Sequence, residues 1–411
     1  MESVQKTRRY VYDLDPLRAV TALGVVAVHV VSFTSYLNQI NAGTQLQNVI
    51  LTSLHYTRSV FMFVTAFAMV YVYYGKPFHL KQFWIRRGIG VLIPYSIWTA
   101  IYVWANSPSI SPTHFVQTTL TDILNGSASY QLYYILLTIQ FYIIFPLFLL
   151  FMKYAARHPW LVLTVSFVVQ VVLYYVDYHT LQATTLAPSS IWNTINQYQN
   201  RFVLTYPFYF ILGGVTALYF EQVRAFLLRH AQLITGALII AILMLWTHFY
   251  IQVNVYHESI GYATSVLQPI MVIYSLAVIG FSFCMACNWA SHIDEQGHPK
   301  GYRFWHTLSD ASFGVYLIHA LILNNVMKWI VPTLPVIWPV AVRVFLTWFL
   351  VAGSAMSISI ILINIPLVSR LVGRAYPLPW KGLPLESFSH LFWKKSQGKK
   401  LATRVDASGN E

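Results

Sequence analysis

Charged residues are scarce in this sequence. They make up 9% of the 411 residues, whereas hydrophobic residues make up 57%. A soluble domain carries about 25% charged residues, so a soluble protein of this composition would have too few polar groups to cover its surface. The scarcity of charge excludes an ordinary soluble domain and indicates that lipid surrounds much of the chain.

Cysteine is almost absent. The two cysteines, Cys284 and Cys287, lie in one apolar segment. Two thiols are too few for a zinc site, and their spacing on a helix is unsuited to a disulfide. We expect both to be core residues, and we expect no metal site.

Acidic residues are few, at 13 against 26 lysines and arginines, and the net charge is +13. The cations stand in short loops between apolar runs, which is typical of charges that orient membrane proteins, so we expect no nucleic acid partner. We also expect no cleavable signal peptide. The first apolar run is as long as a full span, and no small-residue cleavage site follows it cleanly.

A membrane span needs about 20 apolar residues, and the sequence contains ten runs that approach this length. They predict an all-α, polytopic membrane helix bundle of about ten transmembrane helices. The predicted spans are 16–37, 48–74, 84–105, 131–152, 160–176, 201–220, 231–250, 265–287, 310–330 and 338–364.

The positive-inside rule predicts that both termini are cytoplasmic. With this orientation, all but five of the 26 lysines and arginines fall in cytoplasmic segments. The predicted organisation is a cytoplasmic segment at 1–15, a transmembrane domain at 16–376 and a basic, flexible cytoplasmic tail at 377–411. The five exceptions are Arg18, Arg58, Arg201, Lys328 and Arg343.

The first predicted span places a cation and an imidazole on one helix face. Asp15 suits an N-cap and Pro16 the first helical position, so Arg18 should lie in the first turn. His29 follows eleven residues later, which is about three turns and about 16 Å along the same face. This spacing predicts an imidazole near the middle of a membrane core about 30 Å thick.

The ninth predicted span carries a second histidine, His319, at a similar predicted depth. A buried imidazole needs a partner or a function, because an unpartnered polar group in lipid is costly. A histidine that only bonds a neighbouring helix is the simpler interpretation of either residue. The spacing of Arg18 and His29 favours a functional one for His29.

Four further arginines are candidates for ligand binding. Arg58 and Arg343 fall inside predicted spans, and no acidic residue lies in the middle of any span. Each must therefore use backbone carbonyls, water, the membrane interface or an anionic ligand. Arg86 and Arg87, at the inner end of the third span, either orient the chain or bind phosphate through their guanidinium groups.

Six segments, in order along the predicted spans, carry a resemblance to a known family. The chain resembles the acyltransferase family 3 integral membrane proteins across nearly all ten spans, and the first segment matches their R-x10-H signature. Thr65-Ala66 replaces the family's Ser-Gly, and Gln131 stands where many members have a histidine. The matching segments are Arg18 to His29, Arg58 to Phe67, Phe83 to Tyr95, Tyr133 to Pro146, Pro207 to Gly214 and Ser309 to His319.

The resemblance implies a multi-pass O-acyltransferase of the bacterial plasma membrane. It implies cytoplasmic acyl-CoA as co-substrate, with no permanently bound cofactor, and a glycan acceptor. It is nearest to the Gram-positive branch that modifies exopolysaccharides and adhesins. Proteins of polysaccharide synthesis or export are further expected partners. Acetyl and succinyl both stay open as the acyl group.

Residue roles follow from the resemblance as expectations. His29, Arg18 and His319 are expected to be catalytic, with His29 as general base or as carrier of a transient acyl-imidazole. The other candidates fall into two groups: Arg18, Arg86 and Arg87 for binding the acyl donor, and Arg58, Thr65, Tyr316 and Arg343 for the acceptor or the oxyanion.

Two other functions are compatible with ten spans and unpaired arginines. One is a transporter or flippase for polysaccharide or lipid-linked sugar, and the other is a non-catalytic subunit of an export complex. Neither requires Arg18 and His29 on one helix face. Loss of a transporter would abolish exported polymer, whereas loss of an acyltransferase would leave polymer without acyl esters.

Overall fold

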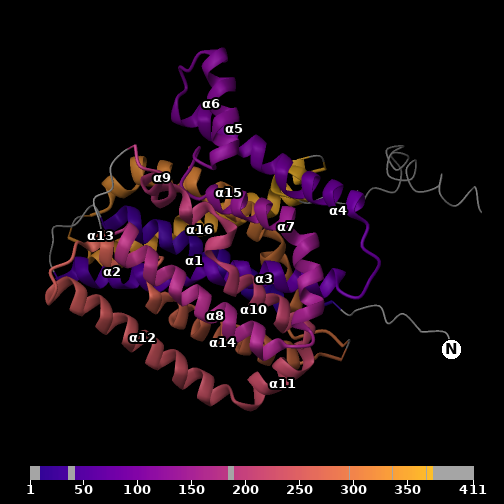
Figure 1. Ribbon diagram of the computed structural model, residues 1–411. Helices are drawn as coiled ribbons and strands as arrows, with labels where there is room; N and C mark the ends of the chain where they lie inside the picture. Colours follow the sequence, from indigo (N-terminus) through magenta and orange to yellow (C-terminus); the bar gives the residue numbers. More distant parts are fainter. Residues whose placement is uncertain are drawn as a thin grey trace, which may run out of the picture. The chain divides into compact units, whose positions relative to one another are not determined.

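The computed structural model describes residues 10–35, 42–183, 189–295, 297–335, 337–366 and 368–373. These residues are almost entirely helical (Figure 1), and within them the one β-type pairing is an isolated bridge between Ile293 and Pro299. They belong to one compact unit, Met1–Arg374. The predicted tail at 377–411 lies outside the described residues.

The elements are helices of very different lengths. Short 3-10 or π-helical turns connect or extend several of them. The α-helices are α1 (Leu14–Ser35), α2 (Ala42–Leu54), α3 (Tyr56–Tyr73), α4 (Leu80–Arg87), α5 (Ile93–Asn106), α6 (Pro112–Asn125), α7 (Tyr133–Ala155), α8 (Pro159–Val176), α9 (Ile191–Tyr198), α10 (Pro207–Leu218), α11 (Phe220–Arg229), α12 (Ala231–Asn254), α13 (Ile260–Ala263), α14 (Pro269–Ser291), α15 (Tyr302–Trp329) and α16 (Val340–Asn364).

The predicted helix bundle is confirmed by length and composition. In the described part of the chain, nine helices or joined helices are long and apolar enough to cross a membrane, and a bent pair would make ten. That pair is α10 and α11, which meet at 96°, so the sixth predicted span is not one straight helix. Its bend has a physical reason: α11 carries Glu221, Arg224 and Arg229, which avoid the lipid core.

Two local predictions differ from the structure. The second predicted span is broken at His55, between α2 and α3. Asp15 is not an N-cap, because α1 begins one residue earlier, at Leu14. The Asp15 carboxylate instead accepts a hydrogen bond from the hydroxyl of Tyr10, over 2.8 Å.

Hydrogen bonds between helix ends show which ends lie together. Arg224 of α11 bonds the Asp13 carboxylate, just before α1, and the backbone oxygen of Cys287, near the end of α14, both at 3.3 Å. Burial raises the pKa of Asp13, and its backbone hydrogen bond and Arg224 oppose this. We call this side the Arg18 end, because α1 begins here and Arg18 lies near its start. At the opposite side, the Arg343 end, Gln45 of α2 bonds Asn254 at the end of α12 over 3.1 Å.

The core is tightly packed where α3 and α10 meet. A Cβ atom at Gly213 of α10 would come within 2.2 Å of the backbone oxygen of Phe63. Only glycine permits this approach. The predicted core position of Cys284 and Cys287 is confirmed, since both are free and buried. Figure 1 shows α11 and α12 at the periphery of the other helices.

Candidate functional site

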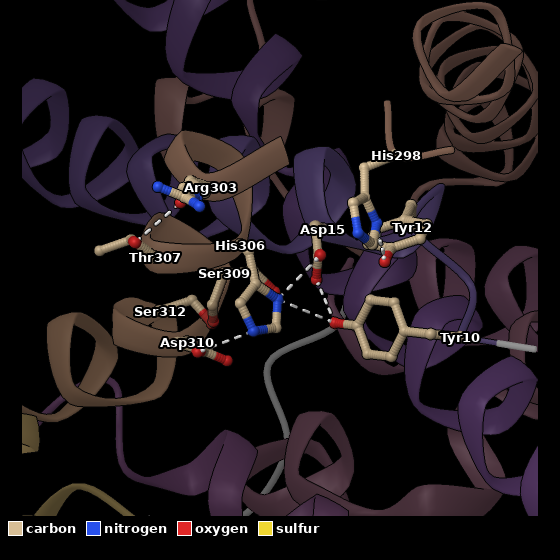
Figure 2. Close-up of polar contacts among 10 residues, drawn as sticks. All are labelled: Tyr10, Tyr12, Asp15, His298, Arg303, His306, Thr307, Ser309, Asp310 and Ser312. Carbon is tan, nitrogen blue, oxygen red and sulfur yellow. Dashed lines mark hydrogen bonds and ion pairs between the residues drawn. The ribbon is translucent and has the colours of Figure 1, made fainter. Parts of the chain in front are cut away.

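Helices α1 and α15 are joined at their N-terminal ends by a network of carboxylates and a histidine (Figure 2). His306 lies between two acids: Nδ1 is 3.2 Å from Asp15 and Nε2 is 3.4 Å from Asp310. The hydroxyl of Tyr10 lies 3.2 Å from Nδ1 of the same ring. This contact sets the register between two parallel helices, each of which carries a predicted catalytic histidine further along.

The two predicted catalytic histidines come together. The rings of His29 on α1 and His319 on α15 stack with centroids 5.3 Å apart and planes inclined by 23°. Tyr130, in the turn before α7, packs against His29 with ring centroids 4.5 Å apart. We call His29 and His319 the histidine pair. Their similar depth agrees with the prediction; their contact could not be read from the sequence.

The hydrogen bonds of His319 define its tautomer. Its Nδ1 lies 3.1 Å from the backbone oxygen of Val315, and a carbonyl oxygen can only accept, so the proton of the neutral ring is on Nδ1. Nε2 then carries the lone pair. It is buried and has no hydrogen-bond partner within the described ranges. The neutral ring therefore presents an unused proton acceptor inside the bundle.

A cavity of about 570 Å³ opens near the Arg18 end. It brings together three arginines from two separate segments, and we call it the arginine cavity. Asp310 is the acid among its lining residues. The polar residues of its lining are Arg18, Thr65, Arg86, Arg87, Tyr134, Thr138, Tyr142, Ser309, Asp310, Ser312 and Tyr316.

Arg87 is half-buried in the wall of this cavity. Its guanidinium carbon lies over the rings of Tyr142 and Phe83, 5.0 and 5.8 Å from their centroids. Its Nε is buried and lacks a hydrogen-bond acceptor among the residues the structure describes. Arg86 is exposed and Arg18 half-buried. The three guanidinium groups form a site suited to an anion.

Tyr316 stands between the arginine cavity and the histidine pair. It lines the cavity, and its ring centroid is 5.9 Å from that of His319. Phe61 and Tyr134, also in the cavity wall, lie 6.3 and 6.0 Å from it. The Tyr316 hydroxyl donates to the backbone oxygen of Gln131. An aromatic layer thus separates the cavity from the two imidazoles.

Arg58 approaches the histidine pair from α3. It donates to the hydroxyl of Tyr206 over 2.7 Å and lies over the rings of Tyr133 and Tyr206, at 5.1 and 5.8 Å. Phe61, three residues further along α3, packs against Tyr316, which contacts His319. In the described structure no carboxylate forms an ion pair with Arg58. The guanidinium is therefore held by phenols.

Two other predicted residues have different surroundings. Thr65 lines the arginine cavity, together with the three arginines predicted to bind the donor. Arg343 lies in the first turn of α16, at the opposite end of the bundle. No described contact joins it to the histidine pair, so the structure does not place it with the other candidates.

Sequence reasoning missed three residues that belong to the site: Tyr130, His306 and Asp310. Tyr130 precedes a helix with nothing to distinguish it. His306 and Asp310 are four residues apart, which puts them on one helix face, and that spacing was the available signal. Within the described ranges, no group of three His, Cys, Asp or Glu residues is placed to hold a metal ion.

Comparisons with known proteins show which family the chain resembles over most of its length. The family model described as "Acyltransferase domain" matches residues 11–364. A Bacillus subtilis protein, named "Putative membrane-bound acyltransferase YfiQ", is 26% identical over 331 residues, which cover 78% of this chain and 84% of that protein. No solved structure matches the chain significantly.

Proposed function

Because this chain belongs to acyltransferase family 3 and is a membrane acyltransferase, we propose that it transfers an acetyl or succinyl group from cytoplasmic acyl-CoA to a hydroxyl of an exported or cell-surface glycan. The observation that carries the proposal is that the arginine cavity and the histidine pair lie on either side of one residue. Tyr316 lines the cavity, and its ring packs against that of His319. In this proposal the Arg18 end faces the cytoplasm of a bacterial cell and both termini lie there.

The arginine cavity supports binding of the donor. Coenzyme A carries several phosphate groups, and guanidinium groups bind phosphate oxygens through paired hydrogen bonds. Arg18, Arg86 and Arg87 supply these groups, and the buried Nε of Arg87 still lacks an acceptor among the described residues. The thioester then extends past Thr65 toward Tyr316.

The histidine pair supports the chemical step. His29 takes the proton from the acceptor hydroxyl, and the oxygen attacks the thioester carbonyl carbon. Arg58 stabilises the negative charge that develops on the carbonyl oxygen. The carbon–sulfur bond breaks, the ester forms and coenzyme A leaves as thiolate. His319, with its free Nε2, accepts the proton from His29 and passes it to the leaving thiolate.

The test is the ester content of extracellular glycan, measured by mass spectrometry in cells carrying the wild-type chain or His29→Ala. We expect wild-type glycan to carry acyl esters and the variant's glycan to be exported without them. The mass increment identifies the acyl group. Esterified glycan from cells that make normal amounts of His29→Ala would contradict the proposal. Loss of the exported polymer, with no ester in either strain, would favour a transporter.

A further inference from the structure

A second hollow lies at the Arg343 end, at the opposite end of the helix bundle from the arginine cavity. It has a volume of about 420 Å³, and we call it the amide hollow. Its wall comes from the segment after α8, the turn between α9 and α10, and the loop between α12 and α14. The lining residues are Gln182, Asn196, Gln199, Asn200, Ser259, Gly261, Tyr262, Ser265, Val266 and Leu267.

The composition of this hollow is specific. Four amides, two serines and one tyrosine provide both donors and acceptors, and none of the residues in this lining carries a charge at neutral pH. Burial also raises the pKa of Tyr262, which keeps its phenol protonated. A site without cations is unsuited to phosphate. Paired donors and acceptors are suited to neutral hydroxyl groups, each of which donates and accepts.

The turn between α9 and α10 is held in place by two glutamines of neighbouring helices. Gln140 of α7 bonds the backbone at Arg201 and Val203, at 2.9 and 3.0 Å. Gln170 of α8, which is fully buried, donates to the Thr205 oxygen over 2.8 Å. The wall formed by this turn is therefore set by the bundle and does not depend on a ligand.

Tyr262, on the other wall, is equally well supported. Its ring stacks on that of Tyr178 with centroids 4.1 Å apart. Each of these tyrosines donates its hydroxyl to the backbone oxygen of the other, at 3.0 and 3.2 Å. A fixed aromatic ring beside amides offers a flat apolar face for the C–H groups of a sugar ring.

One polar atom in the hollow is prepared for a ligand. The side-chain oxygen of Asn200 is buried and has no hydrogen-bond donor in the part of the chain that the structure describes. A buried acceptor left unpaired is costly. A ligand hydroxyl in the hollow would satisfy it.

Hydrogen bonds link the hollow to Arg58. The hydroxyl of Tyr206 donates to the backbone oxygen of Asn200 over 3.1 Å and accepts from Arg58 over 2.7 Å. Phe61, three residues further along α3, packs against Tyr316, whose ring packs in turn against His319 of the histidine pair. A ligand bound at Asn200 is therefore one side chain, Tyr206, away from Arg58, the group proposed to stabilise the oxyanion.

We propose that the amide hollow binds a neutral sugar unit of the acceptor glycan, so that a hydroxyl of an adjoining unit reaches Arg58 and His29. This inference rests on the proposed function, because it assigns the site where the acceptor of that reaction binds. Asn200 accepts from a sugar hydroxyl, and Tyr262 packs against the sugar ring. Gln199 donates from Nε2 to Oδ1 of Asn196 over 3.0 Å, and the remaining donors and acceptors of these two amides provide further hydrogen bonds to the sugar.

The test uses the full-length protein in lipid nanodiscs, with acetyl-CoA and succinyl-CoA as donors. The acceptor is the cell's own exported glycan, stripped of esters by mild alkali. Asn200→Ala is the first variant, because its side-chain oxygen bonds no described residue and its loss should cost the fold little. Asn196→Ala is the second. Asn254→Ala is the matched control, because it removes an amide at the same end of the bundle outside the hollow.

We expect each hollow variant to raise the acceptor KM about 3–10-fold, which is the effect of one lost hydrogen bond. The donor KM should stay unchanged, and Asn254→Ala should behave as wild type. A wild-type acceptor KM in both Asn200→Ala and Asn196→Ala would overturn this inference and leave the proposed function intact. If the wild-type protein transfers neither acyl group to the glycan, the proposed function itself fails, and the inference with it.

Discussion

The arginine cavity and the amide hollow differ in the kind of ligand that each can hold. The first contains three arginines and one aspartate, whereas the lining of the second contains amides and hydroxyls without charge. The first is lined in part by α1 and α15, the helices that carry the histidine pair, whereas the wall of the second comes from short helices and loops. If the proposed ligands are right, charge binds the highly charged donor, and neutral hydrogen bonds recognise the hydroxyl groups of the acceptor.

This division of labour has a consequence for substitutions. A change in the arginine cavity should alter only the donor KM, and a change in the amide hollow only the acceptor KM. A change in the histidine pair should alter neither KM, because it acts on the transition state. The predictions that follow test whether the two regions are independent in this way, and they start with the residues between them.

The largest effect is expected at the histidine pair. His29→Gln should lower kcat by about 10²–10⁴-fold, the usual contribution of a general base. Both KM values should stay near those of wild type, because neither ligand site is changed. Steady-state kinetics in nanodiscs will measure this. His319→Gln is expected to lower kcat less. A larger loss for His319→Gln than for His29→Gln would indicate that His319, and not His29, is the general base.

A smaller effect is expected in the arginine cavity. Arg87→Ala should raise the donor KM about 10–100-fold, because a hydrogen bond between charged groups contributes about 1.5–3 kcal/mol. The acceptor KM should not change. Arg343→Ala is the matched control, since Arg343 lies at the other end of the helices. Equal effects of the two substitutions would show that donor binding depends on total charge and not on the cavity.

A weaker effect should follow from salt. The Debye length falls from about 10 Å at 0.1 M to about 3 Å at 1 M ionic strength. Raising sodium chloride over this range should therefore increase the donor KM several-fold and leave the acceptor KM unchanged. Kinetics at fixed saturation of the other substrate will separate the two. An acceptor KM that rises as steeply would contradict the assignment of a neutral ligand to the amide hollow.

Much of the fold could be predicted from the sequence, because long apolar runs specify helices whatever they pack against. Two breaks were not predicted. The second span is broken at His55, and at the end of the sixth span Tyr219 ends α10 and the polar α11 turns aside. The composition of α11 signalled only that this segment has few apolar residues. The direction of the turn depends on Arg224, which reaches Asp13 and Cys287 on other helices. Such contacts are not visible along one segment.

The candidate site was also predicted only in part from the sequence. The shared end of Arg18, Arg86 and Arg87 followed from helix direction and the placement of cations. The contact between His29 and His319 did not, because it depends on α1 and α15 lying side by side. The amide hollow was missed altogether: its wall comes from loops around 182, 199 and 262, whose polar residues resemble any surface loop until the chain folds.

The smallest effect is expected at the contact that joins α1 to α15 beneath the histidine pair. His306 bridges Asp15 and Asp310, thirteen residues before His319, or about 20 Å along the helix. Its side chain is 39% exposed, and exposed ion pairs contribute only about 0–1 kcal/mol. His306→Ala should therefore lower kcat no more than about fivefold, by loosening the register of the two helices.

Kinetics will show whether the contact made by His306 affects the histidine pair or the arginine cavity. A fall in kcat with both KM values unchanged would mean that His306 acts through the register of His29 and His319. A change in the donor KM alone would mean that it acts through Asp310, which lines the cavity. His292→Ala is the matched control, since His292 is an exposed histidine at the same end, after α14. If His292→Ala lowers kcat equally, the effect comes from losing any histidine at this end of the bundle and not from losing the contact of His306 with Asp15 and Asp310.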